Sequence, residues 1–324
     1  MDELQAFDLS VIGYSHIKKS KICQDSAVSF YDKDMAVAIV CDGHGGNKYF
    51  RSHRGSQFAA TITLDSIKAF MSYENQILEE LRADPDKVLG QLKKNIISNW
   101  NNAVNKDADE NPFSEEELIA LSGADRLIFE HKFELESAYG TTIIAFVLSK
   151  NFCFGLQIGD GKCCAICENG EIIQPIPWDH KCVLNVTTSI CNTDAYANFR
   201  HYYSESLPLA VFVGTDGIDD SFAGIENLYD FYKKITLSFN SSDFEAAVAE
   251  LQEFLPQLSE KGSGDDVSVA GILNIKGINI TEDLFISKKS VLLSEEISEA
   301  TVDSAMIDAA VSEELDEIED KLNE

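Results

Sequence analysis

The sequence predicts an α+β fold. Long helical patterns follow the early strand-like runs, and strand-like runs joined by short turns occupy the middle of the chain. The chain has 324 residues, of which 44% are hydrophobic. A chain of this length and composition can bury a sizeable core, in one large domain or two small ones.

Seven runs are predicted to be strands, because they are rich in β-branched and apolar residues and end near Gly or Asp. They are residues 9–14, 35–41, 141–149, 152–158, 163–168, 210–214 and 267–275. Only Lys150 and Asn151 separate the runs 141–149 and 152–158, so an antiparallel hairpin is expected there.

Five helical patterns lie between these runs. They are residues 49–71, 74–105, 114–136, 228–238 and 243–260. Ser114 is followed by three glutamates, which predicts a capped helix start with carboxylates at the positive end of the helix dipole.

The formal net charge of −29 bears on the possible partners. Such a charge repels nucleic acid and the anionic surface of a membrane, so neither is expected as a partner. The N-terminus has no signal-peptide pattern, and no apolar run is long enough to cross a bilayer. We therefore expect a cytoplasmic protein whose eight cysteines are reduced.

The last part of the chain differs in composition from the rest. We divide the chain into a globular domain, residues 1–280, and an acidic segment, residues 281–324. From Glu282 onward the segment has 14 Asp or Glu and three Lys. It is expected to be an acidic tail or a marginal amphipathic helix, and to be dispensable for chemistry.

Aspartates beside glycine-rich turns are the most informative feature. Asp42, Asp160 and Asp216 each follow a strand-like run and precede a glycine, and Asp265 lies just before the last run. One Asp-Gly pair alone usually marks only a turn. Four such sites at strand ends offer hard oxygen ligands that suit Mg²⁺ or Mn²⁺. Packed carboxylates repel each other without protons or cations, so a divalent metal centre is predicted.

Taken in order, the short motifs resemble those of the metal-dependent protein phosphatases of the protein phosphatase 2C type. The resemblance covers about residues 8–275. The glutamine at position 24 makes the chain similar to the bacterial branch of the family. The motifs are Gln24-Asp25, Asp42-Gly43-His44-Gly45-Gly46, Gly140-Thr141-Thr142, Gly159-Asp160-Gly161, Thr215-Asp216-Gly217 and Gly262-Ser263-Gly264-Asp265-Asp266-Val267-Ser268. The resemblance implies a four-layer αββα sandwich, in which helices flank two packed antiparallel sheets and a cleft at one end holds the metals.

The resemblance also implies the roles of individual residues around two ions, Mg²⁺ or Mn²⁺. Asp42 would bridge the ions and the Gly43 carbonyl would complete one shell. Asp216 and Asp265 would bind the other ion, and Asp25 would act through a bound water. Asp160 and Asp220 match positions where relatives can hold a third, weaker ion.

The reaction implied is hydrolysis of phosphoserine and phosphothreonine esters in phosphorylated protein substrates. A hydroxide that bridges the two ions would attack phosphorus in line. His44 matches the residue that protonates the leaving alkoxide. An isolated histidine in a turn more often packs or caps a loop, but the motif around His44 favours the acid role.

The first motif departs from the family pattern in two ways. Ser20 stands where the family has a phosphate-binding arginine, so Lys19 or Lys21 is the candidate substitute. A lysine supplies a point charge and not a bidentate fork. Gln24 replaces a glutamate. These departures motivate the alternative that the chain is a weak or inactive relative that acts as a binding or scaffold module.

Other chemistries find less support in the sequence. Several cysteines, including Cys163, Cys164 and Cys167, suggest a zinc site, but the spacing has no clean second pair, so buried hydrophobic roles are favoured. No cysteine precedes an arginine by six positions, and no Gly-Lys-Ser/Thr phosphate loop occurs. The segment 179–203 is expected to cover the cleft.

Overall fold

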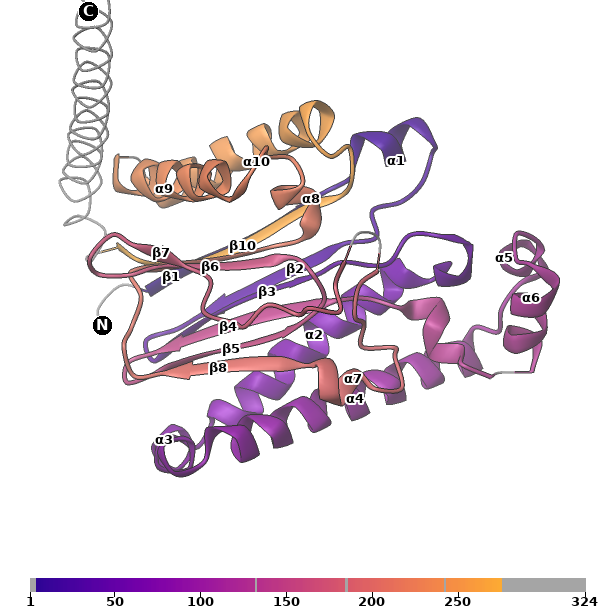
Figure 1. Cartoon of the computed structure of the whole chain (residues 1–324), viewed down its shortest axis with the longest axis horizontal. Helices are drawn as coiled ribbons and strands as arrows, with labels where there is room; N and C mark the ends of the chain where they lie inside the picture. The colour runs from indigo at the N-terminus through magenta and orange to yellow at the C-terminus, as the bar shows by residue number, and fades with distance from the viewer. Residues whose placement is uncertain (1–3, 132, 184–185, 242, 276–324) are drawn as a thin grey trace, which may run out of the picture. The chain divides into compact units, whose positions relative to one another are not determined.

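The computed structural model describes residues 4–131, 133–183, 186–241 and 243–275. Two five-stranded antiparallel sheets pack face to face, and helices cover the outer face of each (Figure 1). The predicted α+β fold, a four-layer αββα sandwich, is confirmed. The acidic segment 281–324 lies outside the described residues, so the expectations for it stay predictions.

Each sheet is assembled from strands that are distant in the sequence. In spatial order the first sheet holds β1 (Leu4–Val11), β10 (Val267–Asn274), β9 (Ala210–Gly214), β6 (Lys162–Ile166) and β7 (Ile172–Ile173). The second holds β2 (Ser26–Tyr31), β3 (Met35–Cys41), β4 (Ile143–Ser149), β5 (Cys153–Ile158) and β8 (Arg200–Ser204).

Helices lie on the outer face of each sheet (Figure 1). Those on the second sheet are α2 (Ser52–Met71), α3 (Glu74–Ala83) and α4 (Pro85–Glu110), and those on the first are α8 (Asp216–Asp219), α9 (Ile225–Ser241) and α10 (Phe244–Lys261). Shorter helices are α1 (Tyr14–Lys18), α5 (Glu115–Ile119), α6 (Gly123–Glu130) and α7 (Ala195–Asn198), with 3₁₀ turns η1 (Asn47–Tyr49) and η2 (Leu135–Tyr139).

Strand β3 shows how the layers are held together. Its residues are all buried, and alternate side chains point to opposite faces of the sheet. Val37 and Ile39 belong to the core under the helices that includes Trp100 of α4. Ala36 and Ala38 belong to the core between the two sheets. Because both faces of β3 are buried, its sequence is a continuous apolar run.

The structure confirms the β4–β5 hairpin and the capping box at Ser114, but it divides two of the predicted helices. The pattern 74–105 becomes α3 and α4, because Pro85 cannot donate a hydrogen bond within a helix and instead opens α4. The side chain of Asp84 caps this new start. The pattern 114–136 becomes α5, α6 and η2, with Ser122 as a second cap.

All eight cysteines are free, and none takes part in a disulfide. Among the described residues, no helix is both long and apolar enough to span a bilayer.

A buried polar network anchors the segment that follows β3. The Arg51 guanidinium donates to Tyr139 Oη (2.8 Å) and to Glu117 Oε1 (2.6 Å). Tyr139 Oη donates in turn to Asp107 Oδ2 (2.6 Å). Arg51 and Asp107 are only 4% and 6% exposed, so each depends on the other groups of the network.

Arg51→Met should lower the free energy of unfolding by about 3 kcal/mol, because it leaves buried carboxylates short of a cation. Arg82→Met is the matched control, since Arg82 pairs with Glu79 and Glu205 at the surface and its loss should change the free energy of unfolding much less. Urea denaturation measures both values. Equal losses in the two variants would contradict the importance assigned to the buried network.

Candidate active site

The topology brings the predicted aspartates to one end of the sandwich. Ser26, the first residue of β2, pairs with Cys41, the last residue of β3. Ile143, the first residue of β4, pairs with Ile158, the last residue of β5. The starts of β2 and β4 therefore lie beside the ends of β3 and β5. Asp25, Asp42 and Asp160 therefore lie at the same edge of the second sheet. In the first sheet, β9 ends beside the start of β10, which brings Asp216 near Asp265.

Asp42 and Asp216, which belong to different sheets, influence each other's pKa. Burial, with the nearby charge of Asp216, raises the pKa of Asp42 well above its usual range. Burial and the charge of Asp160 raise the pKa of Asp216 to about 6. The pKa of Asp25 is raised well above its usual range by burial and by Asp266.

These aspartates influence each other electrostatically, but they do not form one tight shell. In the part of the chain that the structure describes, no three of the predicted ligands have donor atoms that all lie within 4.8 Å of one another. Hard carboxylate oxygens that repel each other when ionised nevertheless suit divalent cations. The donor set therefore fits a divalent cation such as Mg²⁺ or Mn²⁺.

Two threonines hold the main chain of Asp42 in place. The Asp42 N–H donates to Thr142 Oγ1 (3.0 Å), and Thr141 Oγ1 donates to the Asp42 carbonyl (2.7 Å). A third threonine, Thr215, donates to Asp25 Oδ2 (2.8 Å). The sequence motif marked these threonines, and the structure gives them a positioning role.

The motif glycines allow the loops themselves to approach. A β-carbon on Gly43 would lie 2.3 Å from the Gln24 carbonyl oxygen, and one on Gly217 would lie 1.9 Å from the Asp266 carbonyl oxygen. Both glycines therefore make room for the backbone of another motif.

A lysine that sequence reasoning missed lies beside the candidate third-ion residues. Lys162 Nζ lies 3.3 Å from Asp219 Oδ2 and donates to the Asp160 carbonyl (3.0 Å). Burial raises the pKa of Asp219 to about 7, and Lys162 partly opposes that rise. Burial also raises the pKa of Asp220, with Lys162 opposing and Asp160 adding to the rise.

His44 lies in the turn after β3. The backbone N–H of His44 donates to the Gly140 carbonyl (3.0 Å). The imidazole ring meets the ring of Tyr49 edge-on, with the ring centroids 4.9 Å apart. Burial and the charge of Lys48 lower the pKa of His44 to about 4. The imidazole is thus neutral at pH 7 before substrate binds, so an acid role requires a bound anion to raise its pKa.

The two lysines predicted to bind phosphate are both exposed. Lys21 lines a cavity of about 390 Å³, whose wall also includes Gln24 and Tyr49. Gln24 Nε2 donates to the His44 carbonyl (2.9 Å), so this cavity borders the His44 turn. Lys21 is therefore better placed than Lys19.

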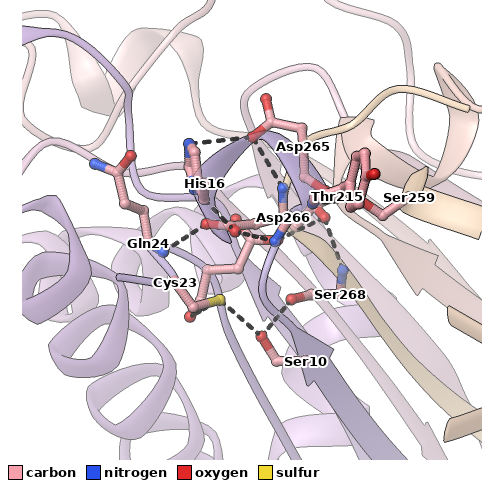
Figure 2. Close-up of polar contacts among 12 residues, drawn as sticks. Ser10, His16, Cys23, Gln24, Thr215, Ser259, Asp265, Asp266 and Ser268 are labelled. Carbon is pink, nitrogen blue, oxygen red and sulfur yellow. Dashed lines mark hydrogen bonds and ion pairs between the residues drawn. The ribbon is translucent and has the colours of Figure 1, made fainter. Parts of the chain in front are cut away.

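Asp266 and His16 are further residues that sequence reasoning missed (Figure 2). Asp266 is 3% exposed and accepts hydrogen bonds from the N–H groups of Gly13 and Gln24, both at 2.6 Å. His16 Nδ1 lies 2.9 Å from the same carboxylate. The Gly262–Ser268 motif pointed to this region, but the pairing with residue 16 spans the whole domain.

The rival interpretation of the cysteines as a zinc site finds no support in the described residues. The group of potential metal ligands found there is His16, Asp265 and Asp266, and it contains no cysteine. Cys163 and Cys164 are buried within β6, and Cys163 faces the core between the sheets. They serve as small hydrophobic residues, as expected.

The segment 179–203 differs in part from the predicted cover of the cleft. Its last residues form β8 at the edge of the second sheet. The preceding part binds two of the motifs, because Ser189 Oγ donates to the Thr141 carbonyl (3.0 Å) and Thr188 Oγ1 accepts from the Gly159 N–H (3.1 Å).

Comparisons with known proteins agree with this fold. The sequence model of the family described as protein phosphatase 2C matches residues 12–256. The chain therefore belongs to the protein phosphatase 2C family, which confirms the resemblance seen in the motifs. No curated protein sequence matches the chain significantly.

Several solved structures share the fold. A bacterial serine phosphatase is 18% identical, with a TM-score of 0.52 over 83% of this chain and 97% of the other. Serine/threonine phosphatase Stp1 from Staphylococcus aureus is 17% identical, with a TM-score of 0.52 over 84% and 97%. PppA, a regulatory component of T6SS in Pseudomonas aeruginosa, is 16% identical, with a TM-score of 0.51 over 83% and 97%.

The raised pKa values predict how the stability of the metal-free protein depends on pH. The folded-state pKa values of Asp216 (about 6) and Asp219 (about 7) exceed the usual 3.8, so folding retains protons that the unfolded chain releases. The free energy of unfolding therefore falls as pH rises toward these values. The raised pKa values of Asp25 and Asp42 extend this fall to higher pH. The melting temperature with chelator should fall by about 3 °C or more from pH 6 to pH 8.

Scanning calorimetry checks this, and the lowered pKa of His44 opposes the trend only below about pH 6.5. Saturating Mn²⁺ should remove the fall, since cations then replace the protons. A melting temperature that rises between pH 6 and pH 8 without metal would contradict the assigned electrostatics.

Proposed function

We propose that this chain hydrolyses phosphoserine and phosphothreonine esters in proteins, with the aid of two divalent ions, Mg²⁺ or Mn²⁺. Membership of the protein phosphatase 2C family supports protein phosphatase activity. The observation that carries the proposal is the gathering of Asp25, Asp42 and Asp216 at one end of the sandwich, where burial raises the pKa of all three carboxyls. Repelling carboxylates at that point are explained by cations that bind there.

The residues that would hold the ions are those expected from the family pattern, namely Asp25, Asp42, Gly43, Asp216 and Asp265, with Asp160 and Asp220 at a weaker third position. When bound, such ions lower the pKa of water and offset charge on the transferring phosphoryl group. Thr141 and Thr142 keep the main chain of Asp42 fixed. Lys21, on the wall shared with Gln24, is the better candidate to contact the substrate phosphate.

Asp216→Asn and Asp265→Asn should each lower the rate of phosphate release from a phosphoserine peptide by roughly a hundredfold or more, because each removes a charged ligand. Asp34→Asn is the matched control, since Asp34 pairs with Lys150 at the surface. Steady-state assays at fixed Mn²⁺ measure the rates. Near-wild-type turnover in folded Asp216→Asn protein would refute the assignment.

The same assay distinguishes an enzyme from a binding module. A folded wild-type chain that binds phosphopeptides but releases no phosphate, with either Mg²⁺ or Mn²⁺, would favour the scaffold alternative. The Asp42 and Asp216 carboxylates argue for catalysis, since gathering carboxylates whose pKa values are raised by burial costs stability that a scaffold need not lose.

His44 is proposed as the general acid, and its importance should depend on the leaving group. His44→Ala should slow hydrolysis of a phosphoserine peptide by roughly a hundredfold, because a serine alkoxide needs a proton as it leaves. Nitrophenyl phosphate, whose leaving group is stable without a proton, should be affected much less. Equal losses on both substrates, with weaker Mn²⁺ binding, would instead give His44 a purely structural role in the Asp42 turn.

A further inference from the structure

His16 lies between two neighbouring carboxylates of the last motif (Figure 2). It belongs to the short helix α1 and is only 8% exposed. Its Nδ1 atom lies 2.9 Å from Asp266 Oδ1, and its Nε2 atom lies 3.7 Å from Asp265 Oδ1. One imidazole thus links a buried carboxylate to a carboxylate of the proposed metal centre.

The hydrogen bonds of Asp266 determine how the imidazole is arranged. Both Asp266 oxygens already accept backbone N–H groups, from Gly13 and from Gln24. The side chain is 3% exposed, so it has little space for a metal ion. Asp266 is instead suited to accept the Nδ1 proton of His16, which leaves the Nε2 lone pair directed toward Asp265.

This arrangement corresponds to the carboxylate–histidine pairs that orient histidine ligands in metal sites. Two atoms bound to one ion at about 2.1 Å each can be separated by up to about 4.2 Å. The 3.7 Å between His16 Nε2 and Asp265 Oδ1 is within that limit. The Asp265 side chain is 58% exposed, so an ion can reach it from solvent.

We propose that His16 Nε2 is a ligand of the ion held by Asp265, and that Asp266 orients the imidazole. The inference rests on the proposed metal centre and adds a nitrogen ligand to a set made only of oxygen. Imidazole nitrogen binds first-row transition ions, whereas Mg²⁺ prefers oxygen ligands. The centre should therefore favour a transition ion such as Mn²⁺ over Mg²⁺.

The decisive variant is His16→Asn. An asparagine amide can donate to Asp266 in place of Nδ1, so the positioning contact is kept, but it offers no nitrogen lone pair toward Asp265. His201→Asn is the matched control. His201 Nε2 also contacts a carboxylate, Asp86 Oδ1 at 2.8 Å, but this pair joins β8 to α4.

The test is pulsed electron paramagnetic resonance of the metal-free full chain reloaded with Mn²⁺. Wild type and His201→Asn should show ¹⁴N coupling from a coordinated imidazole, and His16→Asn should lack it. Calorimetric titration should show Mn²⁺ bound about tenfold or more weakly by His16→Asn, with Mg²⁺ binding changed less than about threefold.

The outcomes separate this inference from the proposed function. Bound Mn²⁺ without ¹⁴N coupling in the wild type would overturn the inference and leave the metal centre intact. Equal weakening of Mn²⁺ and Mg²⁺ in His16→Asn would also overturn it, because a merely structural histidine affects both ions alike. Failure of the wild type to bind either Mn²⁺ or Mg²⁺ would overturn both the inference and the proposed function, whereas binding of Mg²⁺ alone would overturn only the inference.

Discussion

Repulsion among buried carboxylates is the constraint on which the rest of the structure depends. Burial and mutual charge raise the pKa values of Asp25, Asp42 and Asp216 together. A fold that gathers these groups loses stability unless protons or cations compensate. The surrounding structure must therefore hold the loops against a force that drives them apart.

Rigid elements supply that resistance. Asp25 and Asp42 are each adjacent to a strand and Asp216 opens a helix, and the strand β3 before Asp42 is fully buried. The threonines of the third motif fix Asp42 through its main chain, which leaves its carboxylate available to a ligand. Asp266 performs a similar task, because its contacts with Gly13, His16 and Gln24 tie these residues to the loop that carries Asp265.

The fully buried strands were predictable because both of their faces are apolar. The predicted limits 35–41 and 210–214 match β3 and β9. Strands β2 and β8 were missed because their residues are mostly half-buried, so polar side chains such as Ser29 and Arg200 interrupt the apolar pattern. The helix pattern 74–105 was too long because the apolar spacing continues across Pro85, although the backbone does not.

The candidate site was predictable where each residue lies within a short motif. Asp42 and Asp216 could be named from their own neighbours in the sequence. The pairing of His16 with Asp266 could not, because it joins residues 250 positions apart and neither residue type is distinctive alone. The position of Lys162 beside Asp219 likewise depends on how β6 pairs with β9.

The central claim is that ions held by these aspartates enable phosphate ester hydrolysis. The most direct measurement titrates Mn²⁺ into the metal-free chain and follows bound ions and phosphate release from a phosphoserine peptide together. The account predicts no release without ions and full release once about two ions are bound per chain. Undiminished release by protein with no bound ion would contradict it.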